Sequence, residues 1–538
     1  MIDIAVILIY FVIILWIGLS QRSKEASVEE YSLGNRSIPW WPILASILAA
    51  EISAATFLGA PGEGFSLRNY TYAQLCLGTV LARLLVAWLF IKKFYDYGVV
   101  SIYEFLEIRF GKITRCVGSL IFLLTRTLAS GTRLYVAAIF LVLGFEITLG
   151  RPPSEEEEIL IYGGILTLIV CLTAIYTTIG GIKAVIWTDL IQASILVVSL
   201  ISTLGILLFA IPGGFAGAQS VLQQPTDLQI FDLGITSGGS LWRNIFNILN
   251  TEYTLFAALL GSTFITLATH GTDQDMVQRM LTAKNPTESR RAVILSGIID
   301  IPIVLTFLSV GILLYVFYHY YPDPRLPAKS SYVFPFFVLT KMPAGLRGLV
   351  VAALLATAMG SLSTALNSLA TSFYRDFYLS YIASSDTSDR KKILAIRMAT
   401  IGFSILLVLV GMGTAWIVVK KPDTRILPIV LGSFGYTYGS LLGVFLVGLL
   451  TRRGNDFGNM LAMFAGFVVV ALFSHLPQDI ATLIGIRISL YFDLFPPIAF
   501  PWRILFGSVT TFVVACMFPS KQESTVSVYA NRPLHTTH

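Results

Sequence analysis

Apolar stretches long enough to cross a lipid bilayer recur from one end of this sequence to the other. A membrane-spanning helix needs about 20 mostly apolar residues to cross about 30 Å of hydrocarbon. Hydropathy, with Gly, Pro and charged residues as punctuation, predicts thirteen spans, near residues 2–19, 38–66, 71–95, 113–147, 159–180, 184–211, 248–271, 288–318, 346–374, 393–418, 426–450, 457–475 and 500–518. Only 13% of the 538 residues are charged, whereas soluble globular proteins carry roughly 25%. We therefore predict an all-α, polytopic membrane protein that contacts the lipid bilayer and no nucleic acid.

The predicted spans leave no polar stretch long enough to form a separate soluble domain. We expect a single transmembrane domain, divided into a leading helix with an inner loop (1–37), two units of five spans (38–211 and 248–451), two trailing helices (452–518) and a cytoplasmic tail (519–538). The first apolar stretch lacks the basic start and the small-residue cleavage pattern of a signal peptide. We expect it to be retained as a helix.

The sequence also lacks motifs for nucleotide-driven transport and for enzyme chemistry. Without a GxxxxGK[ST] motif, a gradient must supply the energy for any transport. The spans contain no HExxH, GxSxG or paired catalytic aspartates, which argues against an intramembrane enzyme. The four cysteines show no CxxC spacing, so neither a disulfide frame nor a cysteine metal site is predicted. No cofactor is expected.

Positive charges favour one orientation of the chain in the cell membrane. Cytoplasmic loops of membrane proteins carry an excess of Lys and Arg. With the N-terminus outside, the basic loops at 92–115, 279–291 and 390–397 all face the cytoplasm, whereas the basic cluster at 420–425 is an exception. We predict a multi-pass plasma-membrane protein with a cytoplasmic C-terminus.

Two of the predicted spans are interrupted by polar or helix-weakening residues. In the second span the segment 48–65 contains Glu51, Ser53, Gly59 and Pro61, and the seventh span carries TFITLATHGTDQDMVQR at 263–279. Non-helical backbone at membrane depth is tolerated only where it lines a protein cavity, and paired interruptions in two halves indicate a transporter binding site. Here they open two five-span units of opposite orientation, the layout of an inverted-repeat transporter.

The ninth predicted span carries a polar, narrow face. Thr357, Gly360, Ser361, Thr364 and Ser368 follow at helical spacing. Hydroxyl and carbonyl oxygens are hard ligands that suit a hard cation such as Na⁺. The same pattern is also typical of small and hydroxyl residues that pack membrane helices together, and the residues alone leave both interpretations open.

Charged residues within the spans are the other candidates for function. Intramembrane charges are costly and usually functional, which draws attention to Asp189 in the sixth span, Glu51 in the second, and Arg83, Arg126 and Arg133 in the third and fourth. Either carboxylate could pair with an arginine structurally. Alternatively, Glu51 could bind a cation or a proton, Asp189 could be an acid favoured by a helix N-terminus, and an arginine could bind a substrate carboxylate.

Five segments together resemble the sodium:solute symporter family, which includes bacterial proline permease and sodium-coupled galactose and sialic acid transporters. They are the SxxxFLGxPGxG break (53–64), SIYEFLEIRFG (101–111), GGIKAVIWTDLIQ (180–192), GTDQDMVQRMLTAKN (271–285) and LNSLATSFYRDFY (366–378). The similarity extends over most of the chain. It implies a LeuT-type 5+5 inverted repeat, Na⁺ as the coupling ion, and alternating access.

The resemblance also implies positions for Na⁺. In the family's Na⁺ site the ligands are oxygens of Ala49, Ile52, Thr357, Gly360 and Ser361. Several family members have a hydroxyl residue where this chain has Gly360, so only a carbonyl or a water could serve there. A second Na⁺ site, known in the sialic acid transporters, would use Asp189, Ser363 and Thr364.

Substrate contacts are implied on the second, third, fourth and seventh spans. The candidate positions are Glu51, Ser53, Thr56, Gln74, Arg126, Arg133, Thr266 and Gln274. Proline permease has an acidic residue where Glu51 lies. The galactose transporter's asparagine appears here as Thr266, and its gating tyrosine aligns near Thr269, so a galactose-like pocket is not expected.

The function predicted from these features is Na⁺-coupled import of a small organic solute, with a carboxylate or sugar acid preferred. A proton-coupled or uncoupled carrier of the same fold is the first alternative. A channel or a membrane sensor is the second alternative, and the lack of an attached signalling domain argues against a sensor.

Overall fold

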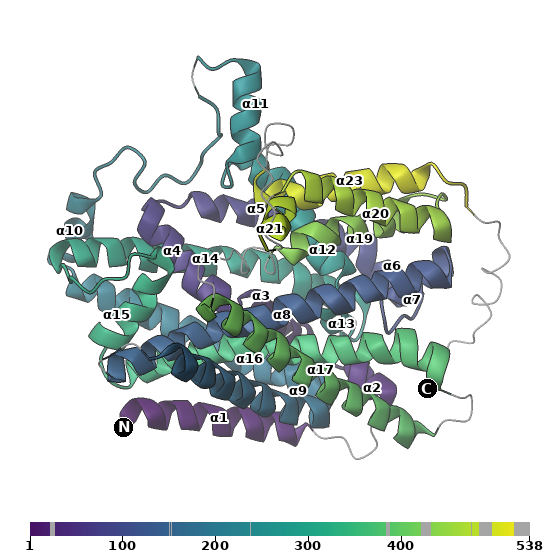
Figure 1. The fold of residues 1–538 in the computed structure, drawn as a ribbon, viewed down its shortest axis with the longest axis horizontal. Helices are drawn as coiled ribbons and strands as arrows, with labels where there is room; N and C mark the ends of the chain where they lie inside the picture. The colour runs from purple at the N-terminus through teal and green to yellow at the C-terminus, as the bar shows by residue number, and fades with distance from the viewer. Residues whose placement is uncertain are drawn as a thin grey trace.

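Long apolar helices run side by side along the length of the molecule (Figure 1). The computed structural model describes residues 1–21, 27–149, 151, 153–236, 238–383, 388–420, 432–474, 476–483 and 498–520. Within these ranges the chain is all-α, with one isolated bridge between Ile38 and Ala283. The start of the predicted span 426–450, the basic residues Lys421 and Arg425, and most of the tail 519–538 lie outside the described residues.

The first half of the chain contains α1 (Ile2–Ser20), α2 (Val28–Leu33), η1 (Gly34–Arg36), α3 (Trp40–Glu51), α4 (Ala54–Leu67), η2 (Thr71–Gln74), α5 (Leu75–Val86), η3 (Ala87–Ile91), α6 (Lys92–Asp96), α7 (Tyr103–Arg109), α8 (Lys112–Leu149) and α9 (Glu155–Ala210). The elements that follow α9 are α10 (Gly214–Val221), α11 (Leu241–Asn250), η4 (Ala257–Ser262), α12 (Thr263–Thr272), α13 (Gln274–Met280), α14 (Pro286–Tyr320), η5 (Ser330–Tyr332), α15 (Val333–Lys341), α16 (Leu346–Ser372), η6 (Phe373–Ile382), α17 (Asp389–Lys420), α19 (Ser433–Leu450), α20 (Asp456–Leu472), α21 (Leu476–Leu483) and α23 (Phe500–Cys516).

Local sequence signals set the ends of the longest helices. At the start of α9, the Ser154 hydroxyl accepts a hydrogen bond from the backbone N–H of Glu157, and the Glu157 carboxylate accepts one from the backbone N–H of Ser154, which satisfies two free N–H groups. Pro286 begins α14 behind an Asn285 cap. Within α9, Gly181 has φ +57° and kinks the helix, because a left-handed conformation suits glycine.

Seven described helices are long and apolar enough to cross a membrane, or eight if the bent pair α3–α4 is one span. Three shorter apolar helices cover residues 434–450, 456–472 and 500–516. In α16, 94% of the apolar window is buried inside the protein, against 17% in α1 and 28% in α17. Thus α16 lies at the centre of the bundle, while α1 and α17 leave apolar surface for lipid.

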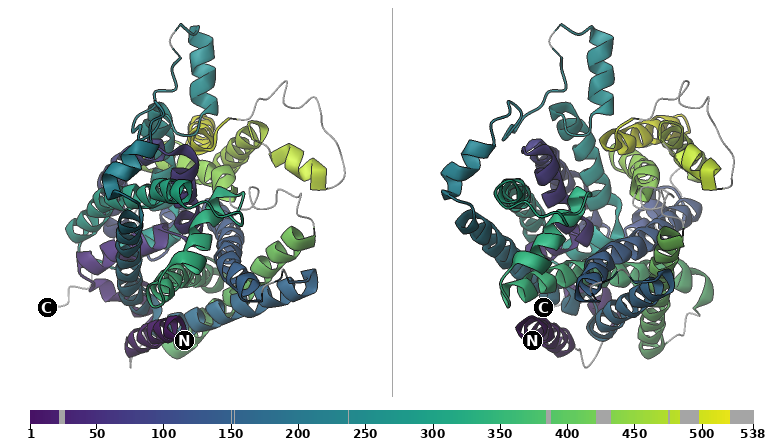
Figure 2. Two further views of the ribbon diagram at one scale, coloured as in Figure 1. Left: turned by 90° about the vertical axis from the view of Figure 1, so that its left-hand side faces the viewer. Right: turned by 60° about the vertical axis from the view of Figure 1, so that its left-hand side comes forward.

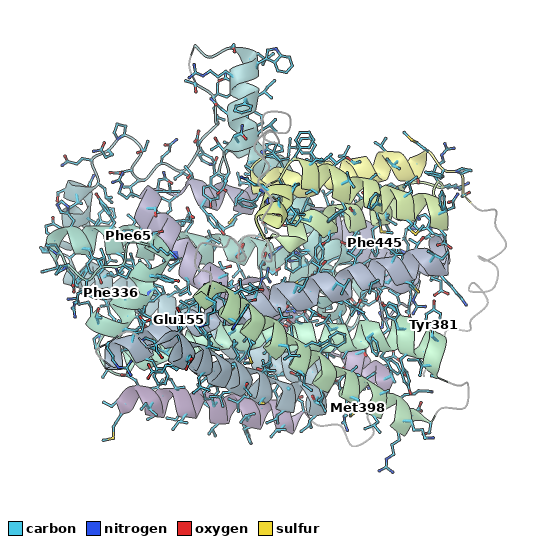
Figure 3. The ribbon with its side chains drawn as sticks, viewed as in Figure 1. Phe65, Glu155, Phe336, Tyr381, Met398 and Phe445 are labelled. Atoms are coloured by element: carbon cyan, nitrogen blue, oxygen red, sulfur yellow. The ribbon has the colours of Figure 1, made fainter. Side chains whose placement is uncertain are left out.

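Different elements lie at the two ends of the bundle. The end with the N-terminus, α10 and α15 lies opposite the end with α2, α6, α7 and α13 (Figure 1). The helix α11 stands out from the body in all three views (Figure 2). Phe65 at the end of α4 and Tyr381 near the end of η6 lie toward opposite ends, with side chains filling the space between the helices (Figure 3).

Candidate functional site

The second predicted span breaks into two helices within the interrupted segment 48–65. The axes of α3 and α4 differ by 68°, because Ile52 (φ −79°, ψ 88°) and Ser53 (φ −81°, ψ 168°) leave the helical conformation. The N–H of Ser53 donates to the carbonyl of Glu51 at 3.0 Å. The Ala49 carbonyl therefore does not receive the N–H of Ser53, as it would in a continuous helix, and it is available to a ligand.

Three buried oxygen atoms converge at the face of Gly360 on α16. A Cβ placed on Gly360 would lie 2.7 Å from Oε1 of Gln192, 3.5 Å from the carbonyl oxygen of Ala49 and 3.5 Å from Oδ1 of Asp189. Asp189 is 0% and Gln192 1% exposed, and neither of these side-chain oxygens has a hydrogen-bond partner among the described residues. Buried acceptors without donors are costly. The arrangement fits a hard cation such as Na⁺.

The hydroxyl groups predicted as Na⁺ ligands all lie buried on α16. Each donates its hydrogen to a carbonyl of the same helix: Thr357 to Leu354 at 2.7 Å, Ser361 to Thr357 at 3.0 Å, Ser363 to Gly360 at 3.0 Å and Thr364 to Gly360 at 3.1 Å. The lone pairs of these hydroxyl oxygens therefore remain available to a cation. Ile52, another predicted ligand, lines a cavity beside the break between α3 and α4.

A cavity of about 420 Å³ adjoins the break between α3 and α4. Of the predicted residues, those that line it are Glu51, Ile52, Thr56, Arg126, Arg133 and Thr266. A second cavity of about 290 Å³ is lined by Ser53, Thr56, Arg133 and Glu63, among others. Thr56 and Arg133 line both, so the two spaces share a wall.

Gln74 and Gln274 do not line either cavity, although both are candidate substrate contacts. Gln74 donates to the carbonyls of Thr71 and Tyr253, each at 3.2 Å. Gln274 bonds the backbone of Ile102 and Val100, each at 2.8 Å. In this conformation both amides hold connecting segments in place.

The two arginines of α8 have different surroundings. Arg126 pairs with Asp273 at 3.1 Å and also with Asp275. Asp273 is the single residue between α12 and α13, so the second break lies within the interrupted segment 263–279. Arg133 stacks on Phe434, with 4.9 Å from guanidinium carbon to ring centroid, and has no carboxylate partner among the described residues. Among the described residues, Arg133 is the α8 arginine that lines the cavity without an ion pair.

Buried ionic contacts join the cavity to the oxygens at Gly360. Arg279 on α13 pairs with Asp275 at 3.0 Å, also donates to the backbone of Ser46, and lies 3.7 Å from Asp189. Ser46 donates to Oδ2 of Asp189 at 2.5 Å. Hydropathy predicts that Arg279 lies in a cytoplasmic loop, but it is 0% exposed. The carboxylates around it supply the compensation that burial of a charge requires.

Glu51 forms an ion pair with Arg83. The sequence had left open whether Glu51 or Asp189 would pair with an arginine of the spans. His270, which also lines the cavity, meets the Thr269 hydroxyl at 3.1 Å through Nδ1. Its other ring nitrogen has no partner among the described residues.

Sequence reasoning missed four residues at these sites: Gln192, Asp273, Asp300 and Tyr438. Gln192 lies three residues after Asp189, hence on the same helical face, which was an available signal. Asp300 was visible as a lone acid in an apolar span, and it lines the larger cavity. Tyr438 donates to Asp273 at 2.8 Å, a contact between distant segments that no local pattern indicates.

A broken helix beside a cavity lined by Glu51, Arg126 and Arg133, with buried oxygens that fit a cation, is typical of a secondary transporter. The sequence model of the sodium:solute symporter family matches residues 31–466. The chain is 26% identical over 465 residues to the sodium/sialic acid symporter of Aliivibrio fischeri, covering 86% of this chain and 85% of that one. It is 27% identical over 522 residues to the sodium/glucose cotransporter of Vibrio parahaemolyticus, covering 92% and 89%.

A solved structure of a Na⁺-coupled sialic acid symporter, substrate-bound and outward-open, superimposes with a TM-score of 0.78 at 24% identity, covering 97% of this chain and 99% of that one. This protein therefore shares that fold. The chain belongs to the sodium:solute symporter family, as the sequence predicted. It is a Na⁺-coupled symporter and not an enzyme, and Na⁺ is its coupling ion.

Proposed function

We propose that the protein imports a small carboxylate-bearing solute, such as a sugar acid, together with Na⁺. The observation that carries the proposal is Arg133, a cavity-lining cation without a carboxylate partner among the described residues. An arginine at membrane depth needs an anion or water, and its planar fork matches a carboxylate. Relatives named as sialic acid symporters support the same class of solute.

The topology that we propose has thirteen spans in a LeuT-type 5+5 arrangement. The helix α9 counts as two spans, because its 56 residues would extend about 84 Å unbroken and it kinks at Gly181. The η4–α12–α13 segment counts as one broken span, like α3–α4. These two breaks open the two repeats. The end with α2, α6, α7 and α13 is taken as cytoplasmic, since it carries Lys92, Lys93 and Arg109.

Coupling in this proposal depends on the meeting of α3, α9 and α16. Na⁺ binds where Ala49 and Ile52 approach Thr357, Gly360 and Ser361, with Asp189 supplying the negative charge. Each positive charge moving inward gains about 2.3 kcal/mol per 100 mV. Binding from outside stabilises the cavity, and rocking of one repeat against the other then releases solute and ion inside.

Uptake into proteoliposomes tests the proposal. An imposed Na⁺ gradient should drive accumulation of a sugar acid, with competition by other carboxylates and none by the matching amides. Uptake that is equally fast in choline would contradict Na⁺ coupling. A pH gradient that replaces Na⁺ would instead favour the proton-coupled alternative, with Glu51 or Asp189 as the proton carrier; the Arg83 partner of Glu51 weighs against that residue.

A further inference from the structure

The side chain of Gln192 is held with its amide oxygen toward Gly360. Its Nε2 donates to the hydroxyl of Tyr10 at 3.4 Å, and that hydroxyl donates onward to Sδ of Met359 at 3.5 Å. Because the Tyr10 hydroxyl accepts from Nε2, the amide oxygen is the atom left facing Gly360. The leading helix α1 thereby orients a group in the core.

The oxygens that meet at this point lack donors. Ser46 satisfies Oδ2 of Asp189, but Oδ1 has no hydrogen-bond partner among the described residues, and neither has Oε1 of Gln192. Leaving a buried acceptor unsatisfied destabilises the protein. A cation among these atoms would remove that cost.

We propose that a single coupling Na⁺ is held at the face of Gly360 by Oδ1 of Asp189, Oε1 of Gln192 and the carbonyl of Ala49. Gln192 supplies the ligand that a hydroxyl side chain at position 360 would otherwise provide, and one shared ion replaces the two sites implied by resemblance. This inference rests on the Na⁺ coupling of the proposed function. Oxygen-only ligands with one carboxylate suit a hard monovalent cation.

The absence of a side chain at Gly360 is part of this site. A Cβ there would come within 2.7 Å of the Gln192 oxygen, closer than carbon and oxygen approach without a shift. Even alanine would therefore displace the amide from the ion. A substitution by serine, which adds a hydroxyl, should also weaken binding instead of improving it.

The test is Na⁺ binding by the purified protein in nanodiscs without solute, read as thermal stabilisation by NaCl at constant ionic strength with choline. We expect Gln192→Leu and Gly360→Ala to raise the Na⁺ midpoint at least about tenfold, and Gln192→Glu, which keeps an oxygen, to retain binding. Ser199→Ala is the matched control, because Ser199 is buried on the same helix and its hydroxyl donates to the carbonyl of Leu196. Titrations should fit a Hill coefficient of one.

Three results would overturn the inference. The first is a Na⁺ midpoint in Gln192→Leu equal to that of the wild type, and the second is a larger shift of the midpoint in Ser363→Ala or Thr364→Ala than in Gln192→Leu. The third is a wild-type protein that Na⁺ does not stabilise. Melting temperatures in choline show whether each variant is folded. A failure of this ion site can be distinguished from a failure of the proposed transport function. Na⁺-driven uptake by wild type with an unchanged Na⁺ dependence in Gln192→Leu rejects only the site, whereas Na⁺ binding without Na⁺-driven uptake rejects only the transport proposal.

Discussion

The carboxylate of Glu51, the last residue of α3, accepts a hydrogen bond from Nη2 of Arg83 on α5, at the wall of the cavity. The other terminal nitrogen of Arg83 donates to the Ser296 hydroxyl at 2.7 Å. The Arg83 side chain is 1% exposed and that of Glu51 is 25% exposed. The pair fixes the end of the broken helix and neutralises two charges at membrane depth.

Neutralising one member of this pair should destabilise the protein. Glu51→Gln leaves Arg83 buried without its anion, and breaking a buried pair costs about 3 kcal/mol. We expect a lower melting temperature in detergent for Glu51→Gln and for Arg83→Gln, and a smaller loss in the double variant than the sum of the two. Additive losses would show that the two side chains do not act as a pair.

The two arginines of α8 should respond differently to substitution. Arg126→Gln leaves Asp273 without its cation and leaves Asp275 with Arg279 alone, so we expect reduced stability and expression. Arg133→Gln removes no ion pair of the described structure, so folding should be retained while binding of a carboxylate solute weakens by about tenfold to a hundredfold, as for a lost charged hydrogen bond. Melting temperature and solute binding, measured together, separate these roles. Arg133→Gln with unchanged affinity would contradict carboxylate recognition by this residue.

Two glycines of α9 provide a matched pair for testing the kink. Gly181 has φ +57°, and an added Cβ would lie 2.7 Å from the carbonyl oxygen of Tyr31, whereas a Cβ on Gly205 would meet nothing within 4 Å. Gly181→Ala should therefore cost about 1–3 kcal/mol, and Gly205→Ala should be neutral or stabilising by up to about 1 kcal/mol. Thermal unfolding in one detergent compares them. Equal effects would show that the kink does not depend on glycine.

Arg279 should carry part of the coupling between solute and ion, because it contacts Asp275 near the cavity and lies beside Asp189. In Arg279→Gln we expect the factor by which Na⁺ tightens solute binding to fall at least about fivefold. Arg325→Gln is the control, because Arg325 is 69% exposed and pairs with Asp323. Calorimetric titration of solute with and without Na⁺ measures the factor. A factor that Arg279→Gln leaves intact would exclude this route.

Much of the fold could be predicted because its signals are local. Apolar length located the helices, and the interrupted segments 48–65 and 263–279 contain the two breaks. Gly59 and Pro61 do not mark the first break, because both lie within α4 and the chain leaves the helical conformation at Ile52 and Ser53. Charged residues were harder to place. Arg279 looked like a loop residue because hydropathy counts its charge, whereas in the structure the carboxylates of Asp275 and Asp189 lie close enough to compensate it.

The sequence by itself determined that this chain is a polytopic helical membrane protein, and its motifs determined the family. The reason is that crossing the lipid requires long apolar helices, and the apolar length of a segment can be read directly from its sequence. Only the tertiary structure decided which arginine of α8 lacks a carboxylate partner among the described residues, that Glu51 is paired with Arg83, and that Gln192 meets Asp189 and Ala49 at Gly360. These relations depend on helices distant in sequence approaching within a few ångströms, and the spacing along one helix does not contain that information.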